Sequence, residues 1–116
     1  MNILGKNEAY QETSTLLKTL GHPVRLQILK EIGTGEACVC HLEAQLDIRQ
    51  AYLSQHLMAL REAGILDTRR EGRFIYYRIE DKHILEIIDS IATLAGVEFQ
   101  IPNQAKRNCD CPKCCK

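Results

Sequence analysis

One stretch of 15 residues, ILDTRREGRFIYYRI at positions 65–79, departs from the helical periodicity of the rest of the chain. β-branched and aromatic residues are concentrated in it, and Glu71-Gly72 stands midway between its two halves. This pattern predicts a β-hairpin closed by a tight turn. The fold must therefore combine a largely helical body with one small hairpin.

Apolar residues recur every three or four positions on both sides of the hairpin, which predicts amphipathic helices. Glycines and one proline separate these segments, which lie at about 7–20, 23–32, 39–46, 50–63 and 81–97. A chain of 116 residues supplies enough material for one small core. Two short helices joined by a tight turn and followed by a hairpin make a winged helix-turn-helix. We therefore expect a mostly α fold with a small β-hairpin wing.

The second helix of such a pair enters the major groove of DNA, and here that helix is 50–63. Leu53, Leu57 and Leu60 mark its inward face, which leaves polar positions near its N-terminus to face outward. Glutamine can contact adenine with two hydrogen bonds, and Ser, Tyr and His can reach base edges or phosphates. The residues expected to contact DNA from this helix and its entrance are Arg49, Gln50, Tyr52, Ser54, Gln55 and His56.

Basic residues are concentrated in the same part of the chain. Six arginines and three acidic residues fall between Arg49 and Arg78, so this segment carries +3 while the whole chain is neutral. Phosphate contacts supply most of the non-specific affinity for DNA, so a local excess of positive charge matters more than the total. We expect the hairpin to contribute Arg69, Arg70 and Arg73. Double-stranded operator DNA is the predicted partner.

Cys38 and Cys40 stand one residue apart in TGEACVCHLEAQL, where the third helix begins. On a regular helix such residues point about 200° apart, so they can share one ion only where the backbone is irregular. The helix start after Gly35 is such a place, and the positive end of a helix dipole lowers the pKa of a thiol. Because both cysteines flank the apolar face of this helix, we expect their side chains to lie outside the core.

Four more cysteines lie within seven residues at the end of the sequence, in CDCPKCC. Cys111 and Cys114 have the Cys-x-x-Cys spacing found in zinc sites. Zn(II) and Cd(II) usually take four ligands and trivalent arsenic takes three, so the first cysteine pair needs further donors. The connector of 12 residues before this cluster can span up to roughly 40 Å. The predicted metal ligands are Cys38, Cys40, Cys109, Cys111, Cys114 and Cys115.

These observations predict two parts, a DNA-binding and dimerisation domain at 1–97 and a flexible connector with a Cys-rich metal-binding tail at 98–116. The tail could instead form a separate zinc knuckle or an unstructured thiol-rich end. No apolar run is long enough for a membrane span, and no secretory signal is recognisable, so we expect a cytoplasmic protein. We find no set of residues typical of an enzyme active site and expect no organic cofactor.

The segments TLGHPVRLQILKEI, CVCHL and LSQHLMALREAGILDTRREGRFIYYRI resemble the ArsR/SmtB family of metal-responsive repressors, from about Leu16 to Asp89. The resemblance implies a homodimer paired through its first and last helices. It also implies binding to an inverted-repeat operator and release when an inducer binds. Three isoleucines of the last helix, Ile87, Ile88 and Ile91, give it more apolar surface than a small monomer needs, which agrees with a dimer.

The Cys-Val-Cys at 38–40 resembles the branch of this family that senses ions through thiolates. The resemblance implies an inducer such as As(III), Sb(III), Cd(II) or Pb(II), and the Cys-x-x-Cys adds Zn(II). Two departures are visible: Glu43 stands where arsenic-sensing members often have a third cysteine, and the N-terminal arm has no cysteine. Asp81 and His83 match part of the family's zinc/cobalt site, but the expected partner positions are Leu94 and Val97. We expect no site there.

Three functions are compatible with these sequence features. The leading one is a repressor released by a thiophilic metal or metalloid ion. The second is a redox- or reactive-sulfur-sensing repressor on the same fold, whose cysteines switch by forming a disulfide or polysulfide. The third is a constitutive DNA-binding or scaffolding protein with a purely structural zinc tail. Titrating an operator complex with metal and with oxidant separates them.

Overall fold

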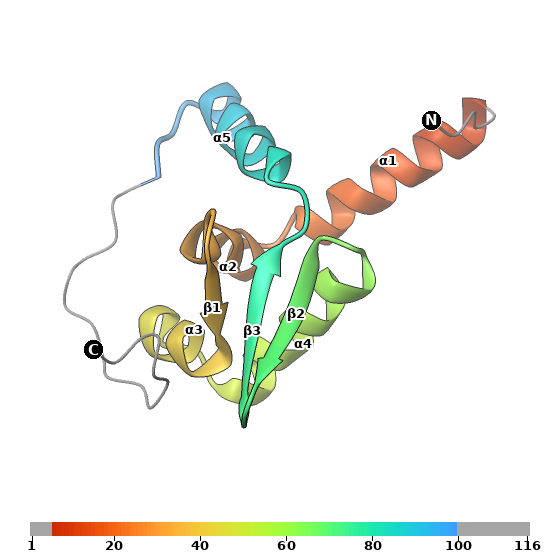
Figure 1. Ribbon diagram of the computed structural model, residues 1–116. Coiled ribbons are helices and arrows are strands. Elements are labelled where there is room, and N and C mark those ends of the chain that lie inside the picture. The colour runs from red at the N-terminus through yellow and green to blue at the C-terminus, as the bar shows by residue number, and fades with distance from the viewer. Residues whose placement is uncertain (1–5, 100–116) are drawn as a thin grey trace.

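The computed structural model describes residues 6–99, and the predicted tail cysteines therefore lie outside the described residues. Five helices and three strands follow one another in this part of the chain (Figure 1). Their order confirms the predicted winged helix-turn-helix with one addition, a short strand before the third helix. The elements are α1 (Lys6–Leu20), α2 (Pro23–Ile32), β1 (Glu36–Cys38), α3 (Val39–Leu46), α4 (Gln50–Glu62), β2 (Leu66–Glu71), β3 (Phe74–Ile79) and α5 (His83–Ala95).

Local sequence explains where α2 begins and ends. Pro23 occupies the first turn, where its missing N–H costs nothing, and the Nδ1 of His22 accepts a hydrogen bond from the Val24 N–H at 3.2 Å. At the other end, Gly33 has a φ of 58° and its N–H bonds to the Leu29 carbonyl. This left-handed conformation suits glycine because it has no Cβ. His22 and Pro23 thus set the start of α2, and Gly33 sets its end.

The three strands form one antiparallel sheet in the order β1-β3-β2. Glu71 pairs with Phe74, so the turn of the hairpin is Gly72-Arg73, one residue later than expected. Gly72 has a φ of 62°, which a two-residue hairpin turn requires. The sequence did not reveal β1, because three residues are too few for a two-residue period to be recognised.

The main hydrophobic core lies between the helices and one face of the sheet. Leu53, Leu57 and Leu60 are buried in it, as predicted, and α2 contributes Ile28, Leu29 and Ile32. Each buried aliphatic side chain contributes roughly 1.5–3 kcal/mol relative to exposure. A second, smaller cluster, formed by Cys38 and Tyr76, is separate from this core.

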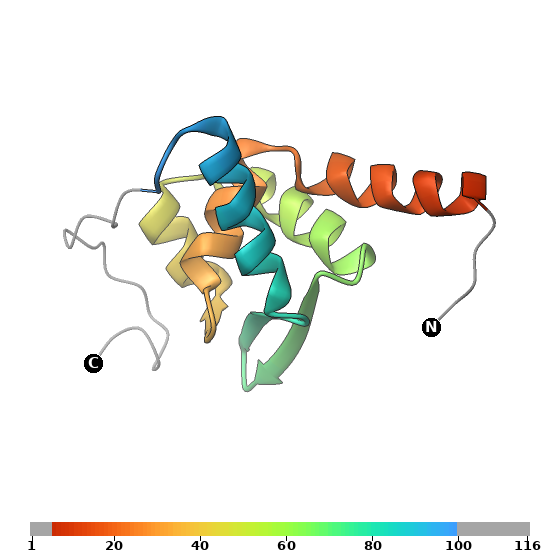
Figure 2. The same ribbon diagram turned by 90° about the horizontal axis from the view of Figure 1, so that it is seen from above.

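The helix α1 projects from the rest of the molecule (Figures 1 and 2). Among residues 7–20 of this helix, Leu20 alone is buried, while Tyr10, Leu16 and Leu17 are exposed apolar residues. An isolated helix of this length is marginally stable in water, and its apolar side chains gain nothing from exposure. Within residues 6–99, no helix has the length and apolar character needed to cross a membrane.

Candidate DNA-binding surface and thiolate pocket

The polar residues of α4 face outward at its N-terminal end. Gln50, Tyr52, Ser54 and Gln55 are exposed, while the three leucines of the opposite face are buried. Arg49 is the N-cap residue in an extended conformation and is also exposed. The helix therefore presents the predicted set of hydrogen-bonding side chains to solvent. Their contact with DNA stays a prediction.

His56 is the exception, and its predicted outward position was wrong. Only 6% of the residue is exposed, and the Nε of Arg25 donates a hydrogen bond to its Nδ1 at 3.0 Å. At about 100° per residue, position 56 lies some 60° from Leu53 around the helix, inside the apolar sector. The polarity of histidine, rather than its position, had suggested an outward side chain.

Burial, together with the nearby His22 and Arg25, holds the pKa of His56 below its ordinary value. The ring lies against His22, with centroids 4.3 Å apart, and meets Tyr52 edge-on at 4.6 Å. Its Nε2 has no hydrogen-bond partner within the described part of the chain. His56 is therefore a packed residue beneath the exposed surface of α4, and it orients Tyr52 from below.

The hairpin presents its arginines in two different ways because neighbouring residues of a strand point to opposite faces. Arg69 donates to both carboxylate oxygens of Glu36, with Nε to Oε2 at 3.3 Å, and lies within 3.4 Å of a Glu71 oxygen. The hydrogen bond to Glu36 raises the pKa of Arg69 well above its ordinary value. Arg78 likewise pairs with Asp67 at 3.0 Å, and this hydrogen bond lowers the pKa of Asp67.

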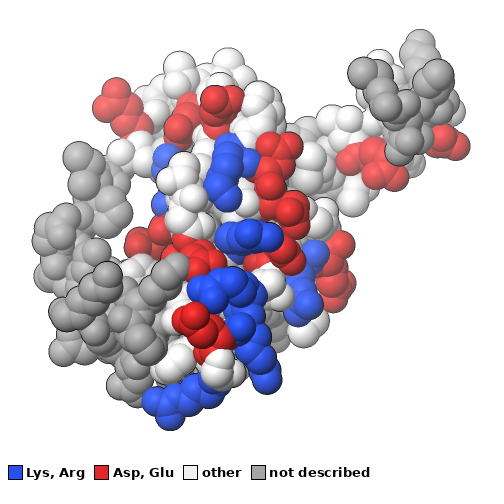
Figure 3. Space-filling view, viewed as in Figure 1, with Lys and Arg blue, Asp and Glu red and all other residues white. Residues whose placement is uncertain are grey.

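Three arginines at this end of the molecule are exposed and form no ion pair with any residue between 6 and 99. These are Arg49, Arg70 and Arg73, of which Arg73 lies over the ring of Phe74 at 5.1 Å. Figure 3 shows basic side chains gathered over the lower part of the sheet and at the bottom of the molecule, with acidic ones between them. Of the predicted wing contacts, Arg70 and Arg73 are thus available for phosphates, whereas Arg69 is paired with Glu36 and Glu71.

The cysteine pair lies at the junction between β1 and α3. Cys38 ends the strand and caps the helix in an extended conformation (φ −82°, ψ 165°), and its Sγ accepts a hydrogen bond from the His41 N–H at 3.3 Å. Cys40 follows in the first turn and is half-buried. The irregular backbone that two adjacent sulfur ligands require is therefore present, and the helix N-terminus favours a thiolate there.

The expectation that neither cysteine is buried was wrong for Cys38, although it lies in the small cluster and not in the main core. It is 1% exposed and packs with Tyr76, which is equally buried. The residue belongs to β1, so its direction follows the pleat of the sheet rather than the apolar face of α3. The unrecognised strand caused this error.

Both cysteines line one open pocket of about 300 Å³ (the further lining residues are Val39, Glu43, Gln50, Arg73, Phe74 and Ile75). The pocket therefore lies between the start of α3, the start of α4 and the tip of the hairpin. Sulfur donors and two predicted DNA contacts share its wall. Among residues 6–99, no three side chains of the ligand types His, Cys, Asp and Glu converge as a metal site.

The two sulfur donors of the pocket are of the kind that a thiophilic ion binds, but two donors are fewer than such an ion usually takes. Two thiolates suit soft or borderline ions, which usually bind three or four ligands. The further ligands predicted from the sequence, Cys109, Cys111, Cys114 and Cys115, lie outside the described residues.

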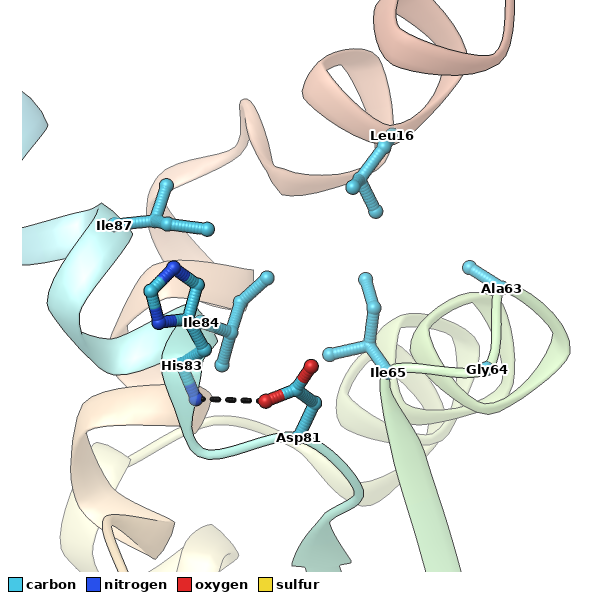
Figure 4. Close-up of a pocket in the computed structure, with 8 residues that line it drawn as sticks. All are labelled: Leu16, Ala63, Gly64, Ile65, Asp81, His83, Ile84 and Ile87. Carbon is cyan, nitrogen blue, oxygen red and sulfur yellow. Dashed lines mark hydrogen bonds between the residues drawn. The ribbon is translucent and has the colours of Figure 1, made fainter. Parts of the chain in front are cut away.

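A second pocket, of about 260 Å³, lies between α1, the turn after α4 and the start of α5 (Figure 4). Asp81 accepts a hydrogen bond from the His83 N–H at 3.0 Å, and His83 pairs with Glu86 at 2.9 Å. These contacts lie at the start of the helix α5. Leu16, Ile84 and Ile87 make the rest of the wall largely apolar.

Known proteins resemble this chain in sequence and in fold. The family model of the arsR family of bacterial regulatory proteins matches residues 22–68, which include the helix-turn-helix. The biofilm growth-associated repressor of Agrobacterium fabrum is 50% identical over 80 residues, which cover 69% of this chain and 68% of that protein. The arsenical resistance operon repressor of Staphylococcus xylosus is 30% identical over 103 residues, covering 89% of this chain and 91% of that one.

The crystal structure of the transcriptional repressor BigR from Xylella fastidiosa resembles this fold with a TM-score of 0.68 and 40% sequence identity. The match covers 76% of this chain and 90% of that one. The sequence and structure comparisons thus indicate the same family. The chain is a member of the arsR (ArsR/SmtB) family of bacterial regulatory proteins, which are DNA-binding transcriptional repressors and not enzymes.

Proposed function

We propose that this protein is a cytoplasmic repressor that binds an inverted-repeat operator as a metal-free homodimer and dissociates when a thiophilic ion binds its cysteines. The observation that carries the proposal is the shared pocket of Cys38 and Cys40 with Gln50 and Arg73. Sulfur ligands and predicted DNA contacts form one wall, so an ion bound there acts directly on the surface that meets DNA.

The surface of α4 and the hairpin supports the DNA part of the proposal. Gln50, Ser54 and Gln55 are exposed and can bond to base edges in the major groove. Arg70 and Arg73, at the hairpin, and Arg49, at the helix entrance, are placed to neutralise phosphates. Direct readout by the helix and sequence-independent contacts by the wing together define the mode of binding.

The exposed apolar surface of α1 and α5 supports a homodimer. Leu17 and Ile91 line an open, mostly apolar pocket of about 400 Å³ with Val97 and Phe99, and Leu94 is 89% exposed. A second copy of the chain that packs α1 and α5 against these residues would cover them in a two-fold interface. The two recognition helices of such a dimer are related by its two-fold axis, so they require an inverted repeat in the DNA.

The tail supports the metal part of the proposal. We assign residues 1–97 to the DNA-binding and dimerisation domain and 98–116 to the connector and metal-binding tail. Cysteines from the tail raise the number of thiolates to the three or four that As(III), Sb(III), Cd(II), Pb(II) or Zn(II) prefers. The arsenical resistance operon repressor is a relative over 89% of this chain, which favours a metal or metalloid inducer.

Operator binding in the presence of ions tests the proposal. DNA selected in vitro by the metal-free protein is labelled, and its anisotropy is followed as As(III), Cd(II), Pb(II) or Zn(II) is added. We expect near-stoichiometric release by at least one ion, with thiolate-to-metal absorption at the same equivalence. Truncation after Asn108 should keep DNA binding but weaken metal affinity. Equal sensitivity of the truncated and full chains would show that the tail is not part of the sensor.

A thiol-based redox or reactive-sulfur sensor is the second candidate. The hydrogen bond from the His41 N–H to the Cys38 sulfur, and the position of Arg73 in the same pocket as Cys40, favour reactive thiolates. Oxidant or persulfide, added without metal, would then release the operator, and a reductant would restore it. A protein that responds to neither metal nor oxidant would be the constitutive binder.

A further inference from the structure

The strand that carries Cys38 is part of the same sheet as the wing. In β1, Cys38 pairs directly with Tyr76 of β3, and Arg69 of β2 pairs with Tyr76 from the other side. Directly paired residues share a face of a sheet, so these three side chains form one row across all three strands. Residues of the alternate rows, such as Ala37 and Ile79, belong to the main core. The row therefore lies on the face turned away from that core.

Side-chain contacts connect the two ends of this row. The guanidinium carbon of Arg69 lies 4.7 Å from the centroid of the Tyr76 ring, in a cation–π contact. The same guanidinium donates to the carboxylate of Glu36, which precedes Cys38 by two residues and so shares its face. One arginine of the wing thus holds both the strand that carries the sulfur and the ring that covers it.

We propose that Arg69 is a positioning residue that couples the cysteine pair to the wing through Glu36 and Tyr76, which rests on the proposed function. Cys38 lines the open pocket but is only 1% exposed, so an ion that takes its sulfur into the pocket must shift β1 or the Tyr76 ring packed against it. Either movement pulls on Arg69 and changes the position of the hairpin. The wing held in place keeps Cys38 packed against Tyr76, whereas the displaced wing lets the sulfur turn toward the pocket.

This arrangement gives the two ligands opposite preferences. DNA favours the wing held by Arg69, because that position presents Arg70 and Arg73 from one rigid hairpin. The ion favours the displaced wing, because the sulfur of Cys38 then moves into the pocket without being held against Tyr76. A ligand shifts the equilibrium between the two wing positions only if it binds one of them more tightly than the other. The coupling is reciprocal, so DNA weakens ion binding by the same factor by which the ion weakens DNA binding.

The experiment measures the ratio of operator affinity without and with saturating Cd(II), by anisotropy, and Cd(II) binding by thiolate-to-metal absorption. In Glu36→Gln and Arg69→Met, Cd(II) still binds, but the ratio falls at least about fivefold toward one. The double variant should behave like either single variant, since both interrupt the same connection. A purely structural role of Arg69 would lower the melting temperature and leave the ratio unchanged.

Asp67→Asn is the matched control. It removes the Asp67–Arg78 ion pair, which joins β2 to β3 in the same sheet; Arg78 stands opposite Glu36 of β1, but the ion pair itself includes neither Glu36 nor Arg69. The ratio should stay at the wild-type value. A loss in Asp67→Asn as large as in Glu36→Gln would overturn the proposal, because any weakening of the hairpin would then suffice.

The outcomes separate the two proposals. If Cd(II) releases the wild type and Glu36→Gln equally, the coupling through Arg69 is wrong and the proposed function stands. If Cd(II) binds the wild type and leaves its operator affinity unchanged, metal-induced release by Cd(II) fails and the coupling fails with it.

Discussion

The rings of His22 and His56 lie with their centroids 4.3 Å apart and tilted by 47°, where the start of α2 meets the buried side of α4. Arg25 donates to the Nδ1 of His56, so this nitrogen carries no proton and the ring is neutral. Protonation would place a positive charge between His22 and a guanidinium, on a residue that is only 6% exposed. The packing of the helix-turn-helix thus depends on a neutral imidazole.

Acid should destabilise the protein through this group. The pKa of His56 is lowered in the folded state, whereas in the unfolded chain it is about 6.5. As the pH falls below about 6.5, the unfolded chain takes up a proton that the folded protein does not, so the free energy of unfolding decreases. His56→Gln should flatten the fall of that free energy between pH 7.5 and 5.5, measured by urea denaturation.

The control for this experiment is His83→Gln, which removes an exposed imidazole at the start of α5. This variant tests whether loss of an exposed histidine also flattens the pH dependence of the free energy of unfolding. Identical pH dependence in His56→Gln and the wild type would show that burial of His56 does not contribute.

Base recognition should depend on the exposed amide of Gln55. Gln55→Ala is expected to weaken binding to the selected operator by roughly 1–3 kcal/mol and to relax the preference at one position. Ser54→Ala should have a smaller effect in the same direction. Anisotropy with operator and scrambled DNA measures both affinities. Met58→Ala is the control, since Met58 is 60% exposed on α4 and offers no hydrogen-bond donor. Unchanged operator affinity in Gln55→Ala would contradict the assigned recognition face.

Phosphate contacts should come from Arg70 and Arg73. Alanine at either position should weaken binding to all sequences and reduce the slope of log affinity against log salt by about one. Arg78→Ala should change the slope less, because Arg78 is paired with Asp67. The comparison uses one DNA fragment over a range of salt concentrations. A larger effect from Arg78 than from Arg70 would reverse the assignment.

The neighbours Arg69 and Arg70 show what the sequence could and could not predict. Periodicity and turn residues predicted five helices and a hairpin, because each is a local pattern. The role of Arg69 depends instead on Glu36, 33 residues earlier, across a strand too short to recognise. The same strand determines the burial of Cys38. The prediction for His56 was wrong for another reason: its polarity suggested an outward side chain, but position 56 lies in the apolar sector of the helix.

Association should depend on the exposed apolar residues of α1 and α5. Leu17→Glu and Ile91→Glu each place a charge where we propose that a second copy packs, and burying an unpaired carboxylate is costly. Both variants should sediment as monomers at micromolar concentration and bind the inverted repeat weakly. Met58→Glu, an equally drastic change at an exposed residue of α4, should remain dimeric. A wild type that is monomeric and still binds its operator tightly would contradict the dimer.

The two cysteines should differ in their contribution to stability while sharing a role in release. Cys38 is 1% exposed against Tyr76, so Cys38→Ser buries a hydroxyl and should lower the free energy of unfolding by about 1–3 kcal/mol. Cys40 is half-buried, so Cys40→Ser should cost less. Each variant should bind the operator without metal and resist release by the inducing ion, because one ligand is missing. Urea denaturation and anisotropy on the same samples measure the two effects. Release of Cys40→Ser at the wild-type metal concentration would mean that Cys40 is not a ligand, whatever its position in the pocket.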